Sequence, residues 1–427
     1  MEIPYKQMRD QFRAEIRAEM RAGTQRPFGP PDSEEAQRAE GAAGETRSRE
    51  RAPGRVSLAQ ASAWLAAARE DPSLLDELGA VAGAARDAIH GRRIRLFAPL
   101  YYANVCVNDC LYCGFRRENR TANRRVLSPG EIAAEAEALL EMGHRRILLV
   151  ASEDPSARGR ALVLDAARAV RSARHGGASA SQVAMEVAPG TIADFRAMAE
   201  AGVDAYVLFQ ETYDRRLYGR VHVSGPKSDF DWRLGAPERA LAGGIPHVGL
   251  GVLLGLGDPR REVLGLIGHA RRIERRSGRP PRTVSLPRLR PAEGSDLSRH
   301  PYRPVSDELL LAAIAVVRLA LPRTGIVLSS REPAALRDRA LDFGVTELSA
   351  GSRTDPGGYT AERKGTPGRD VALAQFEVED RRGFDSMVTV LRDRGYEPLL
   401  DGDPSDPVAA GRSLASPMRD SRSLSGS

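Results

Sequence analysis

The chain is poor in cysteine, in lysine and in long apolar runs, and these shortages exclude several classes of protein. No run of apolar residues is long enough to span a bilayer, so we expect no membrane protein. The opening residues, MEIPYKQMRDQFRAEIRAEM, are charged and lack the apolar core of a secretion signal, which predicts a cytoplasmic location. The 427 residues are enough for one domain of the barrel size class with extensions.

Lysine occurs only as Lys6, Lys227 and Lys364, so nearly all of the positive charge is arginine. The net charge of +6 is modest, and basic and acidic residues are interspersed. No stripe of basic residues with interleaved aromatics indicates a nucleic-acid groove, so we expect no nucleic-acid partner. For Lys227 a solvated surface lysine is the preferred interpretation, and an ammonium group near the functional site is the alternative.

The three cysteines, Cys106, Cys110 and Cys113, fall within eight consecutive residues. Three thiolates at C-x3-C-x2-C spacing can bind three irons of a [4Fe–4S] cube and leave the fourth iron without a protein ligand. That spacing, followed by Gly114 and Phe115, resembles the signature of the radical S-adenosylmethionine (SAM) superfamily. In that superfamily the open iron binds SAM, and reduction of the cluster yields a 5′-deoxyadenosyl radical.

Other uses of these cysteines fit less well. A tetrahedral zinc site needs a fourth Cys or His nearby, and the next histidine is His144. Disulfides would leave one cysteine over and suit a secreted chain. The predicted cofactors are therefore a [4Fe–4S] cluster and SAM.

The chain divides by composition into five segments. The first, from residue 23 onward, is rich in Gly, Pro, Glu and Arg, and the last in Ser, Asp, Pro and Gly, so neither buries enough apolar surface to offset the entropy of ordering. A strand and a helix are expected within 371–397. We expect a mostly disordered arm at 1–55, a helical lead-in at 56–94, a barrel at 95–360, an α/β extension at 361–400 and a disordered tail at 401–427.

Short apolar or β-branched runs alternate with helical segments through the central part. Segments of helical period, such as 128–143 and 259–276, lie between most of the runs. Eight such units predict the α/β class and a TIM-type (β/α)8 barrel with an N-terminal helical extension and a small C-terminal extension. The strands are expected at 95–105, 147–151, 184–188, 205–209, 247–256, 283–289, 325–329 and 345–349.

Polar residues lie at the ends of nearly all these runs. The C-terminal rim of such a barrel carries the active site, so we expect these side chains to converge on one cavity. Ordinary loop polarity is the alternative for any single one. The residues are Glu153, Glu186, Gln210, Glu211, Thr212, Arg288, Arg290, Arg331, Ser349 and Ser352.

Five stretches resemble the radical SAM aromatic amino-acid lyases and occur in the same order as in that family. They are PLYYANVCVNDCLYCGFRRENR, FQETYDRRLYGRVHVSGPKSDFDWRL, SLPRLRP, GIVLSSREP and LSAGSRTDPGGY. That family holds the tyrosine lyase of thiamine biosynthesis (2-iminoacetate synthase), the tyrosine lyase that matures [FeFe]-hydrogenase, and the tryptophan lyase of thiopeptide biosynthesis. The resemblance covers residues 90–400. It implies that the 5′-deoxyadenosyl radical removes hydrogen from the amino group of the substrate, which splits tyrosine into p-cresol and dehydroglycine (2-iminoacetate).

The resemblance also implies roles for single residues. Arg331 matches the arginine that pairs with the substrate carboxylate, and Tyr101 and Ser349 match further substrate-anchoring positions. Glu153 resembles the acidic residue that binds the methionyl amine of SAM. Tyr112 resembles the aromatic position near the adenine, with loop packing as its alternative. The SAM and substrate walls are expected to include Gln210, Glu211, Arg288 and Arg290.

Two further residues keep two interpretations each. His222 is a possible proton carrier by residue type, or a loop histidine without a catalytic role. Glu332 either orients the guanidinium of Arg331 or caps the next helix.

The sequence departs from the family in three places. No cysteine follows Cys113, so we do not expect the second iron–sulfur site of the hydrogenase maturase or its full activity. The stretches HPYRPVSDE and SGPKSDFDWRL nonetheless resemble that maturase more closely than the thiamine enzyme. The ASEDP stretch carries Ser152 and Asp154 where relatives more often have Gly and His. Ser349 matches the thiamine and tryptophan enzymes better than the maturase.

Our leading hypothesis is a radical SAM carbon–carbon lyase that acts on L-tyrosine, in thiamine-thiazole assembly or a related pathway. Two alternatives stay open: a lyase for tryptophan or another amino acid in secondary metabolism, and a non-catalytic Fe–S scaffold, maturation partner or cluster donor. Ring size and a partner for the phenol hydroxyl would separate the substrates, and SAM cleavage would separate enzyme from scaffold. The resemblance implies an electron donor such as flavodoxin or ferredoxin, and a thiazole-synthase-type protein that accepts dehydroglycine.

Overall fold

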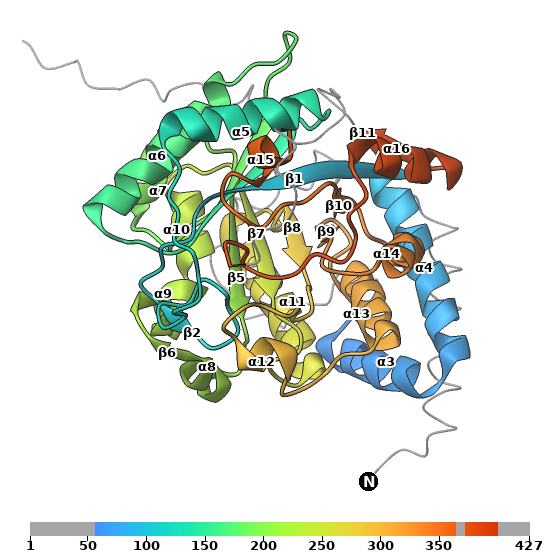
Figure 1. The fold of residues 1–427 in the computed structure, drawn as a ribbon. Coiled ribbons are helices and arrows are strands. Elements are labelled where there is room, and N and C mark those ends of the chain that lie inside the picture. Colours follow the sequence, from blue (N-terminus) through green and yellow to red (C-terminus); the bar gives the residue numbers. More distant parts are fainter. Residues whose placement is uncertain (1–55, 364–371, 400–427) are drawn as a thin grey trace, which may run out of the picture.

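Eight parallel strands close into a barrel at the centre of the molecule (Figure 1). The computed structural model describes residues 56–363 and 372–399. The eighth strand pairs back with the first, which closes the ring and confirms the predicted TIM-type fold. Every predicted strand overlaps an observed one: β1 (Arg93–Ala103), β3 (Arg146–Ala151), β4 (Gln182–Glu186), β5 (Ala205–Glu211), β7 (His247–Val252), β8 (Thr283–Ser285), β9 (Gly325–Leu328) and β10 (Glu347–Ser349).

Helices cover the outside of the barrel and follow most of its strands. Several begin at a residue whose side chain accepts a hydrogen bond from a free backbone N–H of the first turn. Ser128 and Thr191 each form a capping box with an acidic residue three positions later. The covering helices are α5 (Pro129–Glu141), α6 (Ala157–Ser172), α7 (Ile192–Glu200), α10 (Ala236–Ala242), α11 (Pro259–Ser277), α13 (Asp307–Ala320) and α14 (Ala334–Ala340).

Two helices precede the barrel, α3 (Leu58–Glu70) and α4 (Pro72–His90). Both pack against α13, and the buried Trp64 lies in this part of the core. None of the described helices is long and apolar enough to cross a membrane. The predictions for 1–55 and 401–427 fall outside the described residues.

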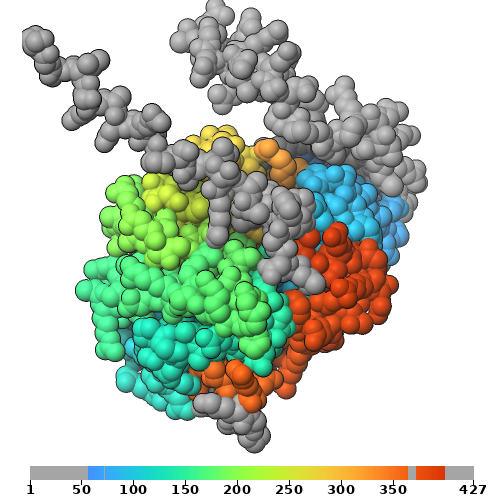
Figure 2. All heavy atoms as spheres, turned by 90° about the horizontal axis from the view of Figure 1, so that it is seen from above, coloured from blue at the N-terminus to red at the C-terminus, as the bar shows by residue number. Residues whose placement is uncertain are grey.

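The C-terminal extension is a helix followed by a strand, α16 (Phe384–Asp393) and β11 (Glu397–Leu399). β11 pairs in parallel with the first residues of β1, at the end of the barrel away from the rim. The guanidinium of Arg86 on α4 donates to the Tyr396 hydroxyl at 3.1 Å. The two ends of the described chain therefore lie side by side, as the blue and orange-red surfaces of Figure 2 show. Another short helix, α15 (Gly358–Arg363), packs on α5.

The chain after β5 covers one side of the barrel mouth. It contains α8 (Arg215–Val221), β6 (His222–Ser224), the 3-10 turn η1 (Pro226–Ser228) and α9 (Phe230–Leu234). β6 pairs antiparallel with β2 (Asp109–Cys110), which lies inside the cysteine stretch. On another side, α12 (Asp296–Arg299) follows Ser295, whose hydroxyl donates to the carbonyl of Leu111 at 2.7 Å.

Candidate active site

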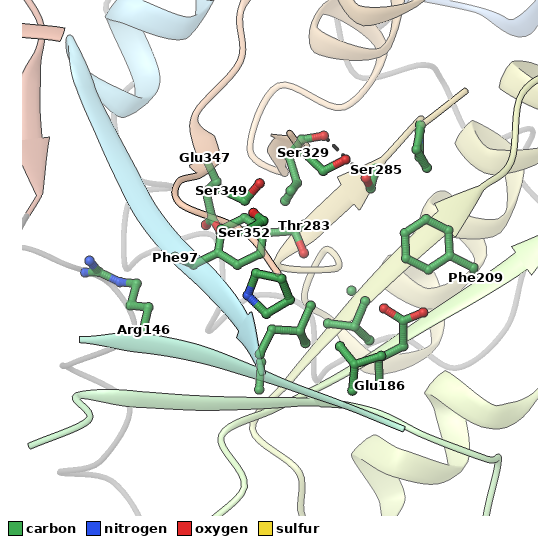
Figure 3. A pocket seen from close by; sticks show the side chains of 18 of the residues that line it. Phe97, Arg146, Glu186, Phe209, Thr283, Ser285, Ser329, Glu347, Ser349 and Ser352 are labelled. Carbon is green, nitrogen blue, oxygen red and sulfur yellow. Dashed lines mark hydrogen bonds between the residues drawn. The ribbon is translucent and has the colours of Figure 1, made fainter. Parts of the chain in front are cut away.

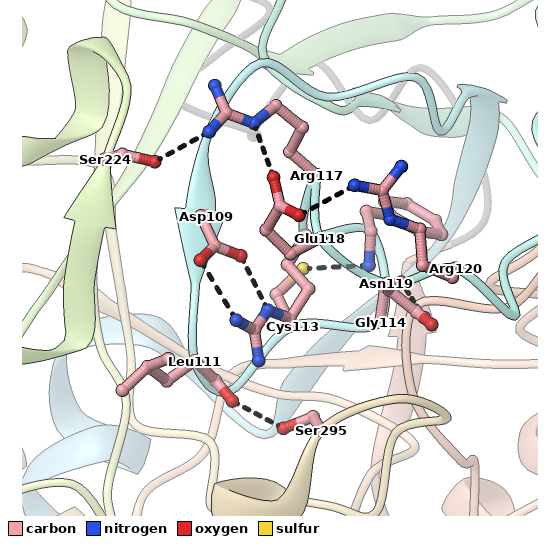
Figure 4. Close-up of polar contacts among 12 residues, drawn as sticks. Asp109, Leu111, Cys113, Gly114, Arg117, Glu118, Asn119, Arg120, Ser224 and Ser295 are labelled. Atoms are coloured by element: carbon pink, nitrogen blue, oxygen red, sulfur yellow. Dashed lines mark hydrogen bonds and ion pairs between the residues drawn. The ribbon is translucent and has the colours of Figure 1, made fainter.

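The three cysteines lie in the segment that follows the C-terminal end of β1. Figure 4 shows Cys113 among the polar contacts of this loop. Cys110 is buried in β2, and Cys106 and Cys113 are partly exposed. Cys106 and Cys113 pack against the same small apolar cluster, which contains Tyr101 and Phe115. The loop thus brings its outer two cysteines back to one place over the end of β1.

Charged and amide side chains fix the course of this loop. Arg116 donates two hydrogen bonds to the carboxylate of Asp109, at 2.6 and 3.0 Å. Asn119 donates to the carbonyl of Gly114 at 2.8 Å. Gly114 has no side chain, and a Cβ there would meet the carbonyl oxygen of Gln375 at 2.8 Å. The C-terminal extension therefore packs directly on the cysteine loop.

The surroundings of the cysteine sulfurs fit a cluster. Within the described residues, no three His, Cys, Asp or Glu side chains are placed to bind a single metal ion. A cube differs from such a site because each thiolate binds its own iron. N–H groups surround the sulfurs: the Phe115 amide lies 3.4 Å and the Gln375 amide 3.8 Å from the Sγ of Cys113, and the Asn108 amide lies 3.9 Å from that of Cys106. Such donors stabilise the negative charge of cluster-bound thiolates.

Glu153 lies two residues after the end of β3 and is held by two residues from the mouth. Arg233 donates to one carboxylate oxygen at 2.6 Å, and the amide of Asn108 donates to the other at 2.9 Å. Burial opposes ionisation, but the positive charges of Arg233 and Lys227 outweigh it, so the pKa of Glu153 is lowered. The predicted SAM-binding carboxylate is thus ionised and fixed beside the cysteine loop.

Glu211, at the end of β5, pairs with the ammonium of Lys227 at 2.7 Å. Only 12% of the Lys227 side chain is exposed, so its interpretation as a solvated surface lysine is wrong. Glu211 also has a φ of 70°, and among the described residues it is the one non-glycine with positive φ. Strained backbone of this kind concentrates at functional sites. The neighbouring Gln210 donates to the carbonyl of Phe230 at 3.4 Å.

Tyr112 is fixed by a histidine. Its hydroxyl lies 2.8 Å from Nε2 of His222, and Nδ1 of that ring lies 2.8 Å from the carbonyl of Tyr218. Because the carbonyl only accepts, Nδ1 carries the proton and Tyr112 donates to Nε2. Burial, and then the charge of Lys227, lower the pKa of His222 to about 2. His222 is therefore neutral near pH 7, which speaks against the proton-carrier interpretation.

Arg331 follows β9, and its guanidinium stacks 3.5 Å from the ring centre of Phe376. Burial lowers the pKa of Arg331. Within the described residues, no carboxylate or carbonyl pairs with this guanidinium. Arg331 is half-buried, and a cation partly withdrawn from water without an anion is costly unless a ligand supplies the negative charge.

Tyr101 and Ser349 lie near Arg331 but have protein partners. The Tyr101 hydroxyl donates to the side chain of Gln375 at 2.8 Å, and the Ser349 hydroxyl accepts the backbone N–H of Ser330 at 2.8 Å. Both line the same cavity as Arg331. These contacts leave the Ser349 hydroxyl hydrogen available to a ligand.

Arg288 and Arg290 are engaged within the wall of the barrel. Glu332, whose side chain is fully buried, pairs with both guanidinium groups. Arg288 also donates to the carbonyl of Val305 at 2.9 Å. Glu332 thus pairs with these two arginines and makes no ion pair with Arg331. It does not cap the next helix either, because α14 begins at Ala334 and its N-cap residue is Pro333. Arg290 still lines the cavity beside Cys113, whereas Arg288 acts from behind it.

Two chambers with lining residues in common lie at the mouth of the barrel and inside it. We call the smaller one, of about 40 Å³, the upper chamber, since it reaches Cys113 and Tyr112. The larger one, of about 120 Å³, is the deep chamber; it lies within the barrel, where serine hydroxyls face it (Figure 3). The residues that line both chambers are Glu186, Phe209, Arg331, Gln375 and Phe376.

Sequence reasoning missed several residues of this site. Arg233, which holds Glu153, lies in a quoted motif but received no role. Gln375 and Phe376 come from the C-terminal extension and lie in none of the quoted motifs; the strand and helix expected within 371–397 gave no sign of a role at the site. For Lys227 the signal was present, because lysine is so rare in this chain.

Two family models match the chain. The radical SAM superfamily covers residues 100–270, and the biotin and thiamin synthesis associated domain covers residues 285–397. The chain is 33% identical over 310 residues to 2-iminoacetate synthase of Escherichia coli, across 72% of this chain and 78% of that protein.

Solved structures agree with these matches. A crystal structure of HydG, a maturase of the [FeFe]-hydrogenase, superposes with a TM-score of 0.75 at 34% identity, over 90% of this chain and 79% of that one. HydG from Carboxydothermus hydrogenoformans superposes with a TM-score of 0.73 at 35% identity, over 93% and 84% of the two chains.

Proposed function

Because the chain belongs to the 2-iminoacetate synthase family of radical SAM enzymes, we propose that it cleaves the side chain of L-tyrosine and releases p-cresol and dehydroglycine. The observation that carries this proposal is the unpaired, half-buried guanidinium of Arg331, which lines a chamber that reaches Cys113. A scaffold has no use for a cation that lines a cavity without a partner, whereas an amino-acid lyase needs an anchor for the substrate carboxylate.

In this proposal Cys106, Cys110 and Cys113 hold three irons of a [4Fe–4S] cluster. The bound cluster and SAM supply a 5′-deoxyadenosyl radical. Glu153 binds the methionyl amine as a carboxylate that is already ionised and oriented by Asn108. Preorganised charges of this kind need no rearrangement when the ligand arrives.

Four further side chains belong to the SAM side of the proposed site. Glu211 and Tyr112 line the upper chamber, where we assign them to the SAM wall. Gln210 adds a side-chain oxygen without a partner in the described part of the chain. Arg288 supports this wall from behind through Glu332.

The substrate side is the boundary between the two chambers. Arg331 pairs with the substrate carboxylate, and the Phe376 ring keeps the guanidinium plane in one orientation. Tyr101 and Ser349 line the cavity beside it and complete the anchor. The tyrosine ring occupies the deep chamber, whose apolar walls include Phe97, and the barrel excludes water from the reacting atoms.

The wider setting follows from the same family. The enzyme works in the cytoplasm, takes electrons from a donor such as flavodoxin or ferredoxin, and delivers dehydroglycine to a thiazole-synthase-type acceptor in thiamine biosynthesis. The proposed reaction ends at dehydroglycine.

Anaerobic reconstitution with iron and sulfide, followed by SAM, dithionite and either tyrosine or tryptophan, tests the proposal. We expect tyrosine-dependent p-cresol and 5′-deoxyadenosine, both measured by chromatography, and loss of p-cresol in Arg331→Ala. Arg275→Ala is the matched control, because Arg275 is exposed on α11. Indole-type products from tryptophan alone would identify the other lyase, and intact SAM beside a reducible cluster would leave only the scaffold.

A further inference from the structure

Glu186 ends β4 and faces Arg331 across the barrel. β4 is the third strand of the ring and β9, which precedes Arg331, is the seventh, so the two residues come from opposite walls. Both line the upper and the deep chamber. Figure 3 shows the Glu186 carboxylate pointing into the cavity.

Glu186 differs from the other carboxylates of the site because no positively charged side chain pairs with it. Glu153 pairs with Arg233 and Glu211 with Lys227. Within the described residues, the carboxylate of Glu186 has no hydrogen-bond or ion-pair partner. Burial, and then the negative charge of Glu211, raise the pKa of Glu186 to about 7, while Arg331, Lys227 and Arg233 act in the opposite direction.

The two unmet groups have opposite charge and do not touch. Arg331 and Glu186 are close enough to influence each other's pKa, yet no ion pair joins them. The space between them suits a molecule with a carboxylate at one end and a cation beside it. An amino-acid zwitterion has this pattern of charges.

We infer that Glu186 binds the amino group of the amino-acid substrate while Arg331 binds its carboxylate. This inference rests on the proposed lyase function, and it adds a second charged anchor on the opposite wall. It places the amino group at the boundary of the upper chamber, on the side of Cys113. The deep chamber, with the hydroxyls of Ser285 and Ser329, is left for the phenol ring.

The same contact handles a proton. An ammonium must lose one proton before an N–H bond of the neutral amine is broken homolytically. Glu186 accepts it, so –NH₃⁺ and –COO⁻ become –NH₂ and –COOH, and no electron is transferred in this step. An acceptor with a pKa near neutrality suits a transfer in either direction.

Equilibrium binding tests this inference without turnover. Cluster-loaded protein with SAM, kept anaerobic and unreduced, is titrated calorimetrically with tyrosine, 3-(4-hydroxyphenyl)propanoate and phenylalanine. The propanoate lacks only the amino group, and phenylalanine lacks only the hydroxyl. We expect Glu186→Gln to bind tyrosine about 10- to 100-fold more weakly, the usual cost of losing a charge-assisted hydrogen bond, and to bind the propanoate as wild type does.

The controls separate this role from a structural one. Glu186→Asp keeps the charge and should lose less affinity for tyrosine than Glu186→Gln. Glu200→Gln, on the exposed surface of α7, should change nothing. The inference is overturned if Glu186→Gln binds tyrosine within twofold of wild type, or weakens tyrosine and the propanoate equally. It is also overturned if the variant loses only the discrimination between tyrosine and phenylalanine, since Glu186 would then bind the phenol. Failure of the proposed function shows separately, as wild-type protein that makes no p-cresol.

Discussion

At the scale of single residues, the site contains two ionisable side chains without an ion-pair partner, although folded proteins normally pair such groups. Buried charges without partners lower stability, so sites that hold them trade stability for binding. Arg331 and Glu186 are half-buried and have no ion-pair partner within the described residues, whereas Glu153, Glu211 and Glu332 are all paired. The two unpaired side chains, Arg331 and Glu186, are therefore the ones available to bind a ligand.

Replacing Arg331 by methionine should separate binding from stability. Methionine keeps contact with the Phe376 ring but removes the uncompensated cation. We expect the ligand-free variant to have a free energy of unfolding equal to wild type or up to about 2 kcal/mol higher, and to bind tyrosine about 10- to 100-fold more weakly. Urea denaturation and calorimetry measure these two quantities. A variant that binds tyrosine normally would contradict the assignment.

Tyrosine affinity should depend on pH through Glu186. Its pKa of about 7 in the free protein means that the carboxyl is mostly protonated at pH 6 and mostly ionised at pH 8. The ion pair with an ammonium needs the carboxylate, so tyrosine should bind more weakly as the pH falls below 7, by up to about tenfold per pH unit. Titrations between pH 6 and 8 measure this slope. Glu186→Gln should be flat over the same range, and a parallel slope in both proteins would assign the dependence to another group.

At the scale of elements, the chain after β5 and the cysteine loop form one unit over the mouth. Gly225 lies where they meet, with a φ of 94°, and a Cβ added there would meet Asn108 and the carbonyl of Val107. Asn108 in turn binds Glu153 and the backbone N–H of Lys227. A small change at this contact should therefore reach the cysteines before it reaches the barrel.

Gly225→Ala tests that coupling. The new Cβ would lie 2.8 Å from the Cα of Asn108, and an alanine at this φ is strained. We expect fewer irons per chain after reconstitution, with the far-UV circular dichroism of the barrel unchanged. Gly268→Ala is the matched control, because nothing lies within 4 Å of its Cβ in α11. Equal iron content in both variants would show that the two segments are independent.

The sequence was most informative about the strands and helices of the barrel and least informative about the segments that pack over its two ends. Buried parallel strands are short apolar runs, and helical segments separate them, so all eight were found. The extension at 371–397 holds a helix followed by a strand, but its partner, the start of β1, lies about 300 positions earlier, and only the fold brings them together.

The same limit applies to the site. Motifs predicted the cysteines and Arg331, but the partners of each carboxylate come from distant segments. Arg233 reaches Glu153 from 80 positions away, and Gln375 reaches Tyr101 from 274. No local pattern encodes such pairs, because they depend on how loops cross the barrel mouth. The roles proposed for Tyr101, Ser349, Gln210 and Arg288 therefore stay predictions until variants are measured.

At the scale of the whole molecule, the C-terminal extension does two things at opposite ends of the barrel. Its first part reaches the mouth, where backbone hydrogen bonds hold it: Gln375 donates to Thr354, Glu377 to Pro291, and Gly114 donates to Gln375. Its last part, α16 and β11, packs at the start of β1. Because each part has its own contacts, packing at the far end should affect stability without changing the site.

Leu391→Ala tests this separation. Leu391 is fully buried on α16, so its truncation should lower the free energy of unfolding by about 2–5 kcal/mol in urea. At temperatures where the variant stays folded, KM for tyrosine should match wild type, because the bonds around Gln375 hold Phe376 against Arg331. Thr389→Ala, exposed on the same helix, is the control for both measurements. A raised KM in the folded Leu391 variant would mean that docking at the far end also sets the position of the substrate anchor, so that the barrel transmits strain from one end to the other.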